Sequence, residues 1–219
     1  MTFVRNGSNQ PRRGSPKRPK PIIGLVGGIG AGKTCVARMF ESLGAAVVDS
    51  DRLGHEELRE PQVAATLRQW WGEKVCSPAG EVDRSALAAI VFNDPAELGR
   101  LEGLLYPRIH QRREALVEGY NADPSVRAIV LDAPKLYEAG LGGYCDAVVF
   151  VDAEWSARVQ RVAASRGWTE AELKRRENLQ NALDKKRMDA DYVVDNHSSV
   201  DELRSQVERC FSSVLASFD

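Results

Sequence analysis

Short runs of apolar residues alternate with helical patterns along most of this chain. The first run, at 22–26, has the near-continuous hydrophobicity of a strand buried on both faces of a parallel sheet, and a helical pattern follows it over 33–43. Four later runs, each followed directly by an aspartate, are predicted as further strands: 45–48, 128–131, 147–151 and 192–194. This alternation is typical of a doubly wound α/β fold, in which ligands bind outside the carboxyl ends of the strands.

Two helical blocks interrupt this alternation. The first, at about 53–120, is too long for a connection and too helical for a loop, so we expect an inserted subdomain that holds substrate. Four large aromatic residues are expected in its core, with a base-stacking platform as the alternative: Trp70, Trp71, Phe92 and Tyr106. The second block, at about 155–186, is rich in arginine and lysine and is predicted as a helical lid, although an exposed helical face with paired charges would also explain most of these residues.

The composition is that of an ordinary soluble globular chain. Of its 219 residues, 43% are hydrophobic and 28% are charged, and no run approaches the roughly 20 apolar residues that a membrane-spanning helix needs. The beginning of the chain lacks the apolar segment of a secretory signal. The four cysteines form no C-x-x-C pair and have no histidine at ligand spacing, which argues against zinc and disulfides. We therefore expect a cytoplasmic protein without a membrane partner.

The net charge of −1 conceals a strongly basic beginning. Residues 1–20 contain six lysine and arginine residues and no acid, so the rest of the chain has a net charge of −7. With almost nothing apolar to bury, this basic tail is expected to be disordered and dispensable, with order beginning at Pro21. An arm for RNA or a membrane surface and a transit peptide are the alternative interpretations. The acidic remainder argues against a nucleic-acid partner.

The first apolar run is followed by the most informative segment of the sequence. Residues 27–34 read G-G-I-G-A-G-K-T and fit the phosphate-loop pattern G-x-x-x-x-G-K-[ST], between a predicted strand and a predicted helix. Glycines let successive backbone N–H groups converge on phosphate oxygens, and the following helix adds its positive end. Lys33 would reach the outer phosphates, and the Thr34 hydroxyl would ligate Mg²⁺. The expected nucleotide contacts in this segment are Gly28, Gly30, Ala31, Gly32, Lys33, Thr34 and Cys35.

A phosphate loop alone indicates only that a nucleoside triphosphate binds, which leaves two classes of protein open. One is a small-molecule kinase, and the other is a GTPase-type switch that regulates a partner. Residues 51–54, D-R-L-G, match the D-x-x-G pattern of GTPases, but they follow Lys33 by only eighteen residues and no N-K-x-D pattern comes after a later strand. The sequence therefore favours a kinase.

Several segments in a fixed order resemble the dephospho-coenzyme A kinase family, from Ile22 to nearly the end of the chain. Besides the phosphate loop with its doubled first glycine, they are V-D-S-D at 48–51, G-E-V-D-R with Leu87 and Val91-Phe92 at 80–92, L-E with Pro107 and Ile109 at 101–109, A-P-K-L-Y-E at 133–138, and A-D-Y-V-V-D-N at 190–196. Three positions depart from the family pattern, because Tyr106 replaces a histidine, Lys135 a leucine and Ser50 an alanine. A tyrosine cannot become a cation near neutral pH, and the ammonium of Lys135 must reach water or a phosphate.

The resemblance implies a P-loop kinase-type three-layer α/β fold with a five-stranded parallel sheet, an inserted helical substrate subdomain and a helical lid. It also implies transfer of the γ-phosphoryl group of ATP, with Mg²⁺, to the ribose 3′-hydroxyl of dephospho-coenzyme A, the last step of coenzyme A biosynthesis. A kinase for another small hydroxyl compound stays open. The expected partners are ATP and dephospho-coenzyme A, for a monomer or small homo-oligomer that binds neither nucleic acid nor membrane.

The resemblance also suggests roles for individual residues. Asp51, which follows the strand beside the phosphate loop, is the expected catalytic base, and Asp49 would order Mg²⁺ through water or support the loop. Arg161, with Arg166 next, is similar to the lid arginines of the family and would neutralise the transferred phosphate together with Lys33. The other residues expected at the site are Asn196 at the adenine and, with Asp51, Tyr106, Tyr137 and Glu138 at the acceptor.

Overall fold

The structure, a computed structural model, describes residues 4–5, 18–77, 79–178 and 182–218. The chain divides into two compact units, the first formed by Met1–Asp49 with Val117–Asp219 and the second by Ser50–Leu116. The second unit spans most of the residues that we expected as an inserted subdomain, and its role in holding substrate stays a prediction. No helix in the described part of the chain has both the length and the apolar stretch that crossing a bilayer requires.

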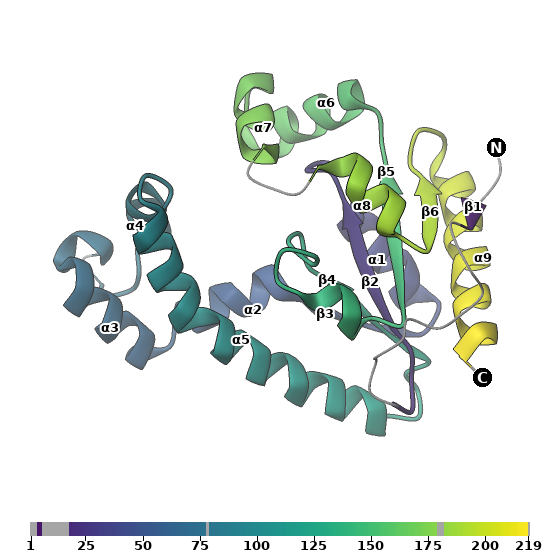
Figure 1. Ribbon diagram of the computed structural model, residues 1–219, viewed down its shortest axis with the longest axis horizontal. Coiled ribbons are helices and arrows are strands. Elements are labelled where there is room, and N and C mark those ends of the chain that lie inside the picture. Colours follow the sequence, from purple (N-terminus) through teal and green to yellow (C-terminus); the bar gives the residue numbers. More distant parts are fainter. Residues whose placement is uncertain (1–3, 6–17, 78, 179–181, 219) are drawn as a thin grey trace. The chain divides into compact units, whose positions relative to one another are not determined.

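The first unit is built on a sheet whose five main strands are paired in parallel (Figure 1). Their order across the sheet is β3 (Ala45–Asp49), β4 (Ala128–Asp132), β2 (Ile22–Gly27), β5 (Ala147–Asp152) and β6 (Tyr192–Asp195). This arrangement confirms the predicted five-stranded parallel sheet. It places the strand that leads into the phosphate loop at the centre, because two parallel strands lie on each side of β2.

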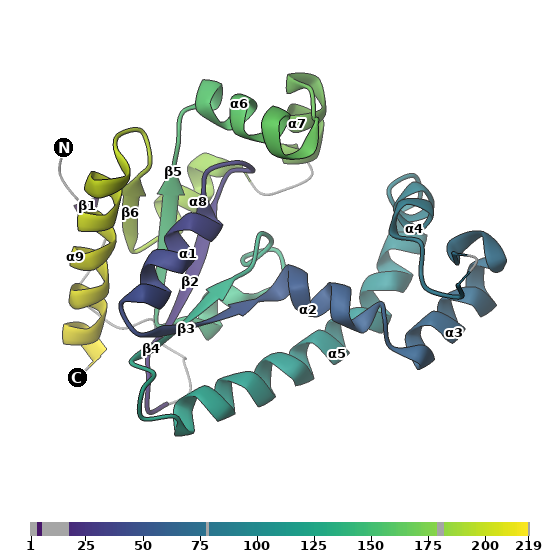
Figure 2. The same ribbon diagram turned by 180° about the vertical axis from the view of Figure 1, so that it is seen from behind.

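Helices cover both faces of this sheet and complete the three layers (Figures 1 and 2). On one face lie α1 (Lys33–Ser42), which follows β2, and the long α9 (Val200–Phe218). On the opposite face α8 (Leu183–Asp189) packs against β2 and β5. Between β5 and α8 the chain forms α6 (Trp155–Arg166) and α7 (Glu170–Glu177), which pack against each other. These two helices belong to the segment expected as a lid, and a lid function stays a prediction.

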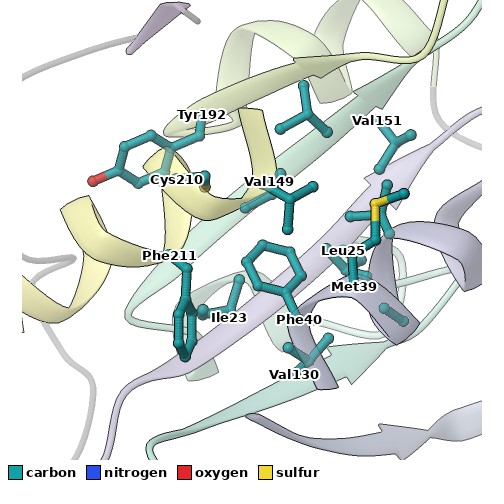
Figure 3. Packing of buried hydrophobic residues seen from close by; sticks show 14 of the residues in the cluster. Ile23, Leu25, Met39, Phe40, Val130, Val149, Val151, Tyr192, Cys210 and Phe211 are labelled. Carbon is teal, nitrogen blue, oxygen red and sulfur yellow. The ribbon is translucent and has the colours of Figure 1, made fainter. Parts of the chain in front are cut away.

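The core of the first unit lies between the sheet and the layer of α1 and α9 (Figure 3). The rings of Phe40 and Phe211 meet edge to face, with their centroids 5.8 Å apart and their planes at 61°. Ile23 and Val149, on the neighbouring strands β2 and β5, are fully buried in the same cluster. Burying one such side chain stabilises a fold by about 1.5–3 kcal/mol, so this layer fixes the position of α1 and of the loop before it.

The second unit is mainly helical. Its elements are α2 (Ser50–Glu57), α3 (Pro61–Trp71), the short 3-10 helix η1 (Glu73–Val75), α4 (Arg84–Val91) and α5 (Pro95–Ala122), whose last turns belong to the first unit. Asp83 caps α4, because its carboxylate accepts from the N–H groups of Ser85 and Ala86 at 2.8 and 3.1 Å. Leu67 and Leu87 lie in a separate core that holds these helices together.

The aromatic residues of the second unit divide into two pairs. Trp70 and Trp71 pack against its core, as expected. Phe92 and Tyr106 are 49% and 44% exposed, so the expectation that they are core residues was wrong. The helical spacing of apolar positions identifies the apolar face of a helix. It cannot show which apolar side chain lies at the rim of that face.

A buried ion pair joins α2 to α5 within the second unit. The Glu57 side chain is 3% exposed and accepts from Nε of Arg108 at 2.6 Å and from Nε of Arg112. Burial raises the pKa of Glu57, but the hydrogen bonds and charges of the two arginines outweigh that effect, and the pKa lies below its usual value of 4.5. Glu57 is therefore a buried carboxylate whose charge is compensated.

The basic tail contacts the first unit at both of its ends. β1 (Val4–Arg5) pairs antiparallel with β6, at the edge of the sheet. Arg18 donates to the carbonyl oxygen of Tyr144 at 3.1 Å, and Lys20 donates to that of Tyr120 at 2.6 Å. Two cations of the tail thus have carbonyl acceptors on the first unit. The residues between β1 and Arg18 lie outside the described part of the chain, so the disorder expected there stays a prediction.

Candidate active site

The phosphate loop lies between β2 and α1, as its pattern predicted. Gly30 and Gly32 have φ angles of 78° and 96°, a left-handed conformation that a side chain would strain. Gly32 is the N-cap residue of α1, and its carbonyl accepts from the N–H of Cys35 at 2.9 Å. The first turn of α1 begins directly after the loop, so the positive end of the helix dipole favours an anion there.

The Lys33 side chain turns back over the phosphate loop. Its Nζ donates to the carbonyl oxygens of Gly27 and Gly28, at 3.1 Å each. The next two residues, Thr34 and Cys35, have exposed side chains in the first turn of α1. The hydrogen bonds hold the ammonium at the loop that would surround a phosphate, so its positive charge is already in position for phosphate oxygens.

Two of the residues predicted for the ATP site reach the loop. Asn196 follows β6, and its Nδ2 donates to the carbonyl oxygen of Ala31 at 2.7 Å. Arg161, on α6, has Nη1 3.3 Å from the same oxygen and 3.4 Å from that of Gly30, and its Nη2 lies 3.4 Å from the Asn196 carbonyl oxygen. A Cβ atom on Gly32 would lie 2.4 Å from Asn196 Nδ2, so this close approach also requires glycine. Side chains from α6 and from the end of β6 therefore meet at one loop.

Arg166, the second predicted arginine, has a different environment at the end of α6. Its guanidinium lies 4.8 Å from the ring centroid of Trp168, and that of Arg176 lies 4.2 Å from the same ring. The cation–π contact holds the Arg166 guanidinium beside Trp168, in the connection between α6 and α7. Its proposed contact with ATP stays a prediction.

Two charged residues at the loop were not predicted as site residues. Arg158, on α6, is 7% exposed at its side chain, and its Nη1 lies 2.5 Å from Oε1 of Glu177 and 3.4 Å from the Ile29 carbonyl oxygen. The same Oε1 accepts from the Ile29 N–H at 3.1 Å. A Cβ atom on Gly28 would lie 2.3 Å from Arg158 Nη1, so the second glycine of the loop makes room for this pair. In the sequence, Arg158 stands among many basic residues and Glu177 has no distinguishing pattern.

Aspartates end the two strands on one side of the loop. Asp49 of β3 lies opposite Asp132 of β4 in the parallel register, and Leu25 of β2 lies opposite Asp132. Asp132 is 9% exposed, whereas Asp49 is exposed. Asp132 is thus a carboxylate on the strand next to the phosphate-loop strand. Its position after an apolar run was visible in the sequence, but an aspartate after a strand is so common that it was not singled out.

On the other side of the loop, the aspartates that end β5 and β6 lie beside an arginine and a histidine. Asp152 pairs with Arg187 of α8, and Asp195 Oδ1 lies 3.2 Å from Nδ1 of His197. Nε2 of His197 also lies 3.9 Å from Oδ1 of Asp152. This cluster lies on the residues next to Asn196, so we interpret it as support for the segment that follows β6.

A buried lysine of α8 holds the segment 133–138, which follows β4. Lys186 of α8 is 1% exposed at its side chain, and its Nζ lies 2.9 Å from Oε1 of Glu138 and 3.4 Å from the carbonyl oxygen of Pro134. Leu136 is fully buried, whereas Lys135 is exposed. Lys135 thus reaches water, one of the two outcomes expected for an ammonium at a leucine position. The carboxylate of Glu138, predicted at the acceptor, has a buried cation beside it.

Tyr137, a second residue predicted at the acceptor, lines a cavity of about 400 Å³. The other lining residues are Gly140, Gly142, Gly143 and Asp189. Two of these glycines belong to the short 3-10 helix η2 (Leu141–Tyr144) before β5. The cavity offers space beside Tyr137, whose role at the acceptor stays a prediction.

The remaining acceptor residues belong to the second unit. Asp51 lies in the first turn of α2, two residues beyond the end of β3, and is exposed. Tyr106 lies on α5, and its hydroxyl donates to Oε1 of Glu102, one turn earlier, at 2.7 Å. The roles proposed for both residues therefore depend on the acceptor and stay predictions.

A parallel sheet with a phosphate loop after its central strand, and an arginine and an amide from later elements on that loop, defines a P-loop nucleotide-binding protein. The family model described as dephospho-CoA kinase matches residues 21–202. The dephospho-CoA kinase of Thermobifida fusca is 36% identical over 187 residues, which cover 84% of this chain and 92% of that protein. That of Deinococcus radiodurans is 35% identical over 201 residues, which cover 92% and 95%. The chain belongs to the dephospho-CoA kinase family.

Solved structures agree with this assignment at the level of the fold. A protein of Thermus thermophilus is 34% identical, with a TM-score of 0.75 over 91% of this chain and 98% of that one. The dephospho-CoA kinase of Campylobacter jejuni is 19% identical, with a TM-score of 0.61 over 90% and 98%. The second likeness concerns the fold alone, because so few residues are shared.

Proposed function

We propose that this protein transfers the γ-phosphoryl group of ATP to the ribose 3′-hydroxyl of dephospho-coenzyme A, the last step of coenzyme A biosynthesis. The bond from the γ-phosphorus to the bridging oxygen of ADP breaks, a bond to the 3′-oxygen forms, and the hydroxyl proton passes to a base. One observation carries the proposal. The complete phosphate loop has Lys33 and Arg161 on it, in a chain whose family match spans 21–202.

The charges at the loop suit the transition state of phosphoryl transfer. That state is loose, with negative charge spread over the phosphate oxygens, so positioning and electrostatics matter more than proton removal. Lys33, Arg161 and the amino-terminal end of α1 all direct positive charge at the same loop. An arginine so placed supplies on the order of 10³–10⁵ in rate. We assign this role to Arg161, with Arg166 as the second candidate.

The oxygen donors around the loop fit Mg²⁺, which accompanies ATP in such reactions. The Thr34 hydroxyl stands in the first turn of α1, and the Asp132 carboxylate ends the strand next to β2. Mg²⁺ prefers hard oxygen ligands and keeps several waters, so one hydroxyl and one or two carboxylates suffice beside the nucleotide. Thr34 would bind the ion directly, and Asp132 or Asp49 would bind its waters. When bound, Mg²⁺ neutralises charge on the transferring phosphate.

Asp51 is proposed as the base that accepts the proton of the 3′-hydroxyl. Replacing it by asparagine keeps its size but removes its basicity, so turnover should fall by about 10²–10⁴ while ATP binding is retained. Steady-state kinetics and calorimetric titration with ATP would measure the two effects. Asp49→Asn is the matched control, because a residue that orders Mg²⁺ should change the Mg²⁺ dependence of the rate instead. An Asp51→Asn enzyme within tenfold of wild type would remove Asp51 from the mechanism.

The identity of the acceptor separates this proposal from its alternatives. A coupled assay of ADP release should show that dephospho-coenzyme A accelerates ATP consumption and that a panel of other small alcohols does not. A better substrate among those alcohols would assign the protein to another small hydroxyl compound. Strong GTP hydrolysis that does not depend on any acceptor would support a GTPase-type switch.

The remaining features of the proposal concern the protein in solution. ATP and dephospho-coenzyme A are the proposed partners, and the cytoplasm is the proposed location. We expect a monomer or small homo-oligomer. Light scattering coupled to size-exclusion chromatography would measure the oligomeric state.

A further inference from the structure

A carboxylate of the first unit occupies a position at the phosphate loop that suits an anion. Oε1 of Glu177, at the end of α7, accepts from the N–H of Ile29 at 3.1 Å. The Glu177 side chain is only 14% exposed. Backbone N–H groups of such a loop bind the oxygens of phosphates, and here one of them binds a carboxylate oxygen instead.

The same carboxylate oxygen holds a buried arginine against the loop. Arg158 Nη1 lies 2.5 Å from Glu177 Oε1, and the Arg158 guanidinium also lies 5.0 Å from the ring centroid of Trp155. A guanidinium binds phosphate as readily as carboxylate, because both anions present paired oxygens to its planar donors. The cation is thus fixed at the loop, and its anionic partner is one that phosphate can replace.

We propose that Arg158 is a further phosphate-binding arginine of this site, an inference that rests on the proposed function. Glu177 holds Arg158 at the loop until the nucleotide binds. The outer phosphates of ATP then replace the Glu177 carboxylate at the Ile29 N–H and at the Arg158 guanidinium. Replacement is required because phosphate and carboxylate repel each other when they share one donor pair. Glu177 therefore competes with the phosphates and lowers the apparent affinity for the triphosphate.

Binding measurements on the full chain, without acceptor, test the competition. Glu177→Gln keeps the size of the side chain and removes its charge. A carboxylate that occupies the loop nine-tenths of the time lowers apparent affinity about tenfold, so this variant should bind ATP about tenfold more tightly in calorimetric titrations. Its affinity for AMP, which lacks the outer phosphates, should stay within about twofold. Unchanged or weaker ATP binding, or an equal gain for AMP, would overturn the competition.

Another acid of α7 provides a matched control. Glu172 is paired with Arg175 and Arg176 of the same helix, at 2.9 and 2.6 Å. Glu172→Gln removes the same charge from the same helix, α7. Because Glu172 is paired with arginines of its own helix, this variant should leave the affinities for ATP and AMP unchanged. An equal gain in ATP affinity for both variants would attribute the effect to net charge and overturn the local competition.

Variants of Arg158 test the other half of the proposal. Arg158→Lys keeps a cation and Arg158→Gln does not, so ATP affinity should fall by about tenfold or more in the glutamine variant and be partly kept in the lysine variant. Inorganic tripolyphosphate, which has no adenosine, should lose the same factor when it displaces a fluorescent nucleotide. Melting temperatures identify any variant that fails to fold. If both variants fold and bind ATP as the wild type does, Arg158 has no role at the phosphates.

The outcome also distinguishes this inference from the proposed function. If the wild-type protein does not phosphorylate dephospho-coenzyme A but Glu177→Gln still binds ATP more tightly, the acceptor is wrong and the inference on the loop is supported. If the wild type is an active kinase and Glu177→Gln leaves the ATP affinity unchanged, the inference is wrong and the proposed function is supported.

Discussion

Cys35 follows the proposed metal ligand Thr34, and its thiol is exposed in the first turn of α1. Cys145 and Cys210 are buried. Burial, to which the charge of Asp191 adds, raises the pKa of Cys210 far above its usual range, so that thiol is both shielded and protonated. Differences in thiol reactivity should therefore report on occupation of the phosphate loop.

Iodoacetamide should modify Cys35 well before Cys145 and Cys210 in the native protein. Bound nucleotide covers the start of α1, so MgATP at ten times its Kd should slow the modification of Cys35 roughly tenfold. Mass spectrometry of peptides after timed quenching measures each site separately, and Cys35→Ser serves as the control. Equal rates with and without MgATP would place Cys35 outside the nucleotide site.

The residues of the phosphate loop could be predicted because eight consecutive positions carry the whole signal. Arg161 and Asn196 needed the family resemblance, since neither has a local pattern that points to a phosphate. Glu177 and Arg158 could not be found in either way. The hydrogen bond from Ile29 to Glu177 joins residues 148 positions apart, and only the folded chain brings them together.

At the scale of elements, the two sides of the ion pair between α2 and α5 should contribute unequally to stability when they are removed. Arg108 and Arg112 are 35% and 38% exposed and can turn to water if Glu57 is removed, whereas Glu57 cannot reach water if they are removed. The double variant Arg108→Met with Arg112→Met should therefore lose roughly 3–5 kcal/mol of unfolding free energy, the cost of an uncompensated buried charge. Glu57→Gln should lose much less. Urea denaturation at pH 7 measures both, and equal losses would contradict the asymmetry.

The dependence of this pair on pH has a definite sign. Because the pKa of Glu57 is lowered in the folded protein, its contribution is complete above the unfolded pKa of about 4.5 and is lost as the pH falls through the folded pKa. The unfolding free energy of the wild type should thus fall more steeply below pH 4.5 than that of Glu57→Gln. In the double arginine variant only the effect of burial remains, and it raises the pKa of Glu57. Protonation of Glu57 at acidic pH should therefore restore part of the unfolding free energy. Parallel pH profiles for the three proteins would refute this account.

The elements themselves differ in how well they could be predicted. The five parallel strands are continuous apolar runs because both of their faces are buried, and that composition is visible without a structure. β1 could not be predicted, because two residues in a polar tail have no periodicity and pair only where β6 offers a free edge. The exposure of Phe92 was missed for a related reason, since the depth of burial depends on how neighbouring helices pack.

At the scale of the whole molecule, Lys20 acts as a distant cap for a long helix. The last turn of α5 contains no basic residue, and Lys20 donates to the carbonyl oxygens of Tyr120 and Asp123 at its end. A cation at a helix carboxyl end contributes about 0.3–1 kcal/mol. A protein beginning at Arg18 should melt like the full chain, whereas one beginning at Pro21 should melt up to about 2–4 °C lower in calorimetry. Both should retain wild-type kinetics.

Lys20→Met in the full chain is the control for this truncation, and it should reproduce the lower melting temperature. If the protein that begins at Arg18 already has a lower melting temperature than the full chain, the stabilisation comes from β1 instead of Lys20. A large rise in the KM for ATP or for dephospho-coenzyme A in either truncated protein would show that the basic tail belongs to the site.

The first of the two boundaries between the units falls at the peptide bond between Asp49 and Ser50. β3 ends at Asp49 and α2 begins at Ser50, so no linker residue separates the strand from the helix. Exposed segments ordinarily tolerate insertions, and both Asp49 and Asp51 are exposed. One added residue here would nevertheless rotate Asp51 by about 100° around the axis of α2 and aim its carboxylate elsewhere. Substitution of an exposed residue beside Asp51 is therefore compatible with catalysis by Asp51. Insertion of a residue at this junction is not.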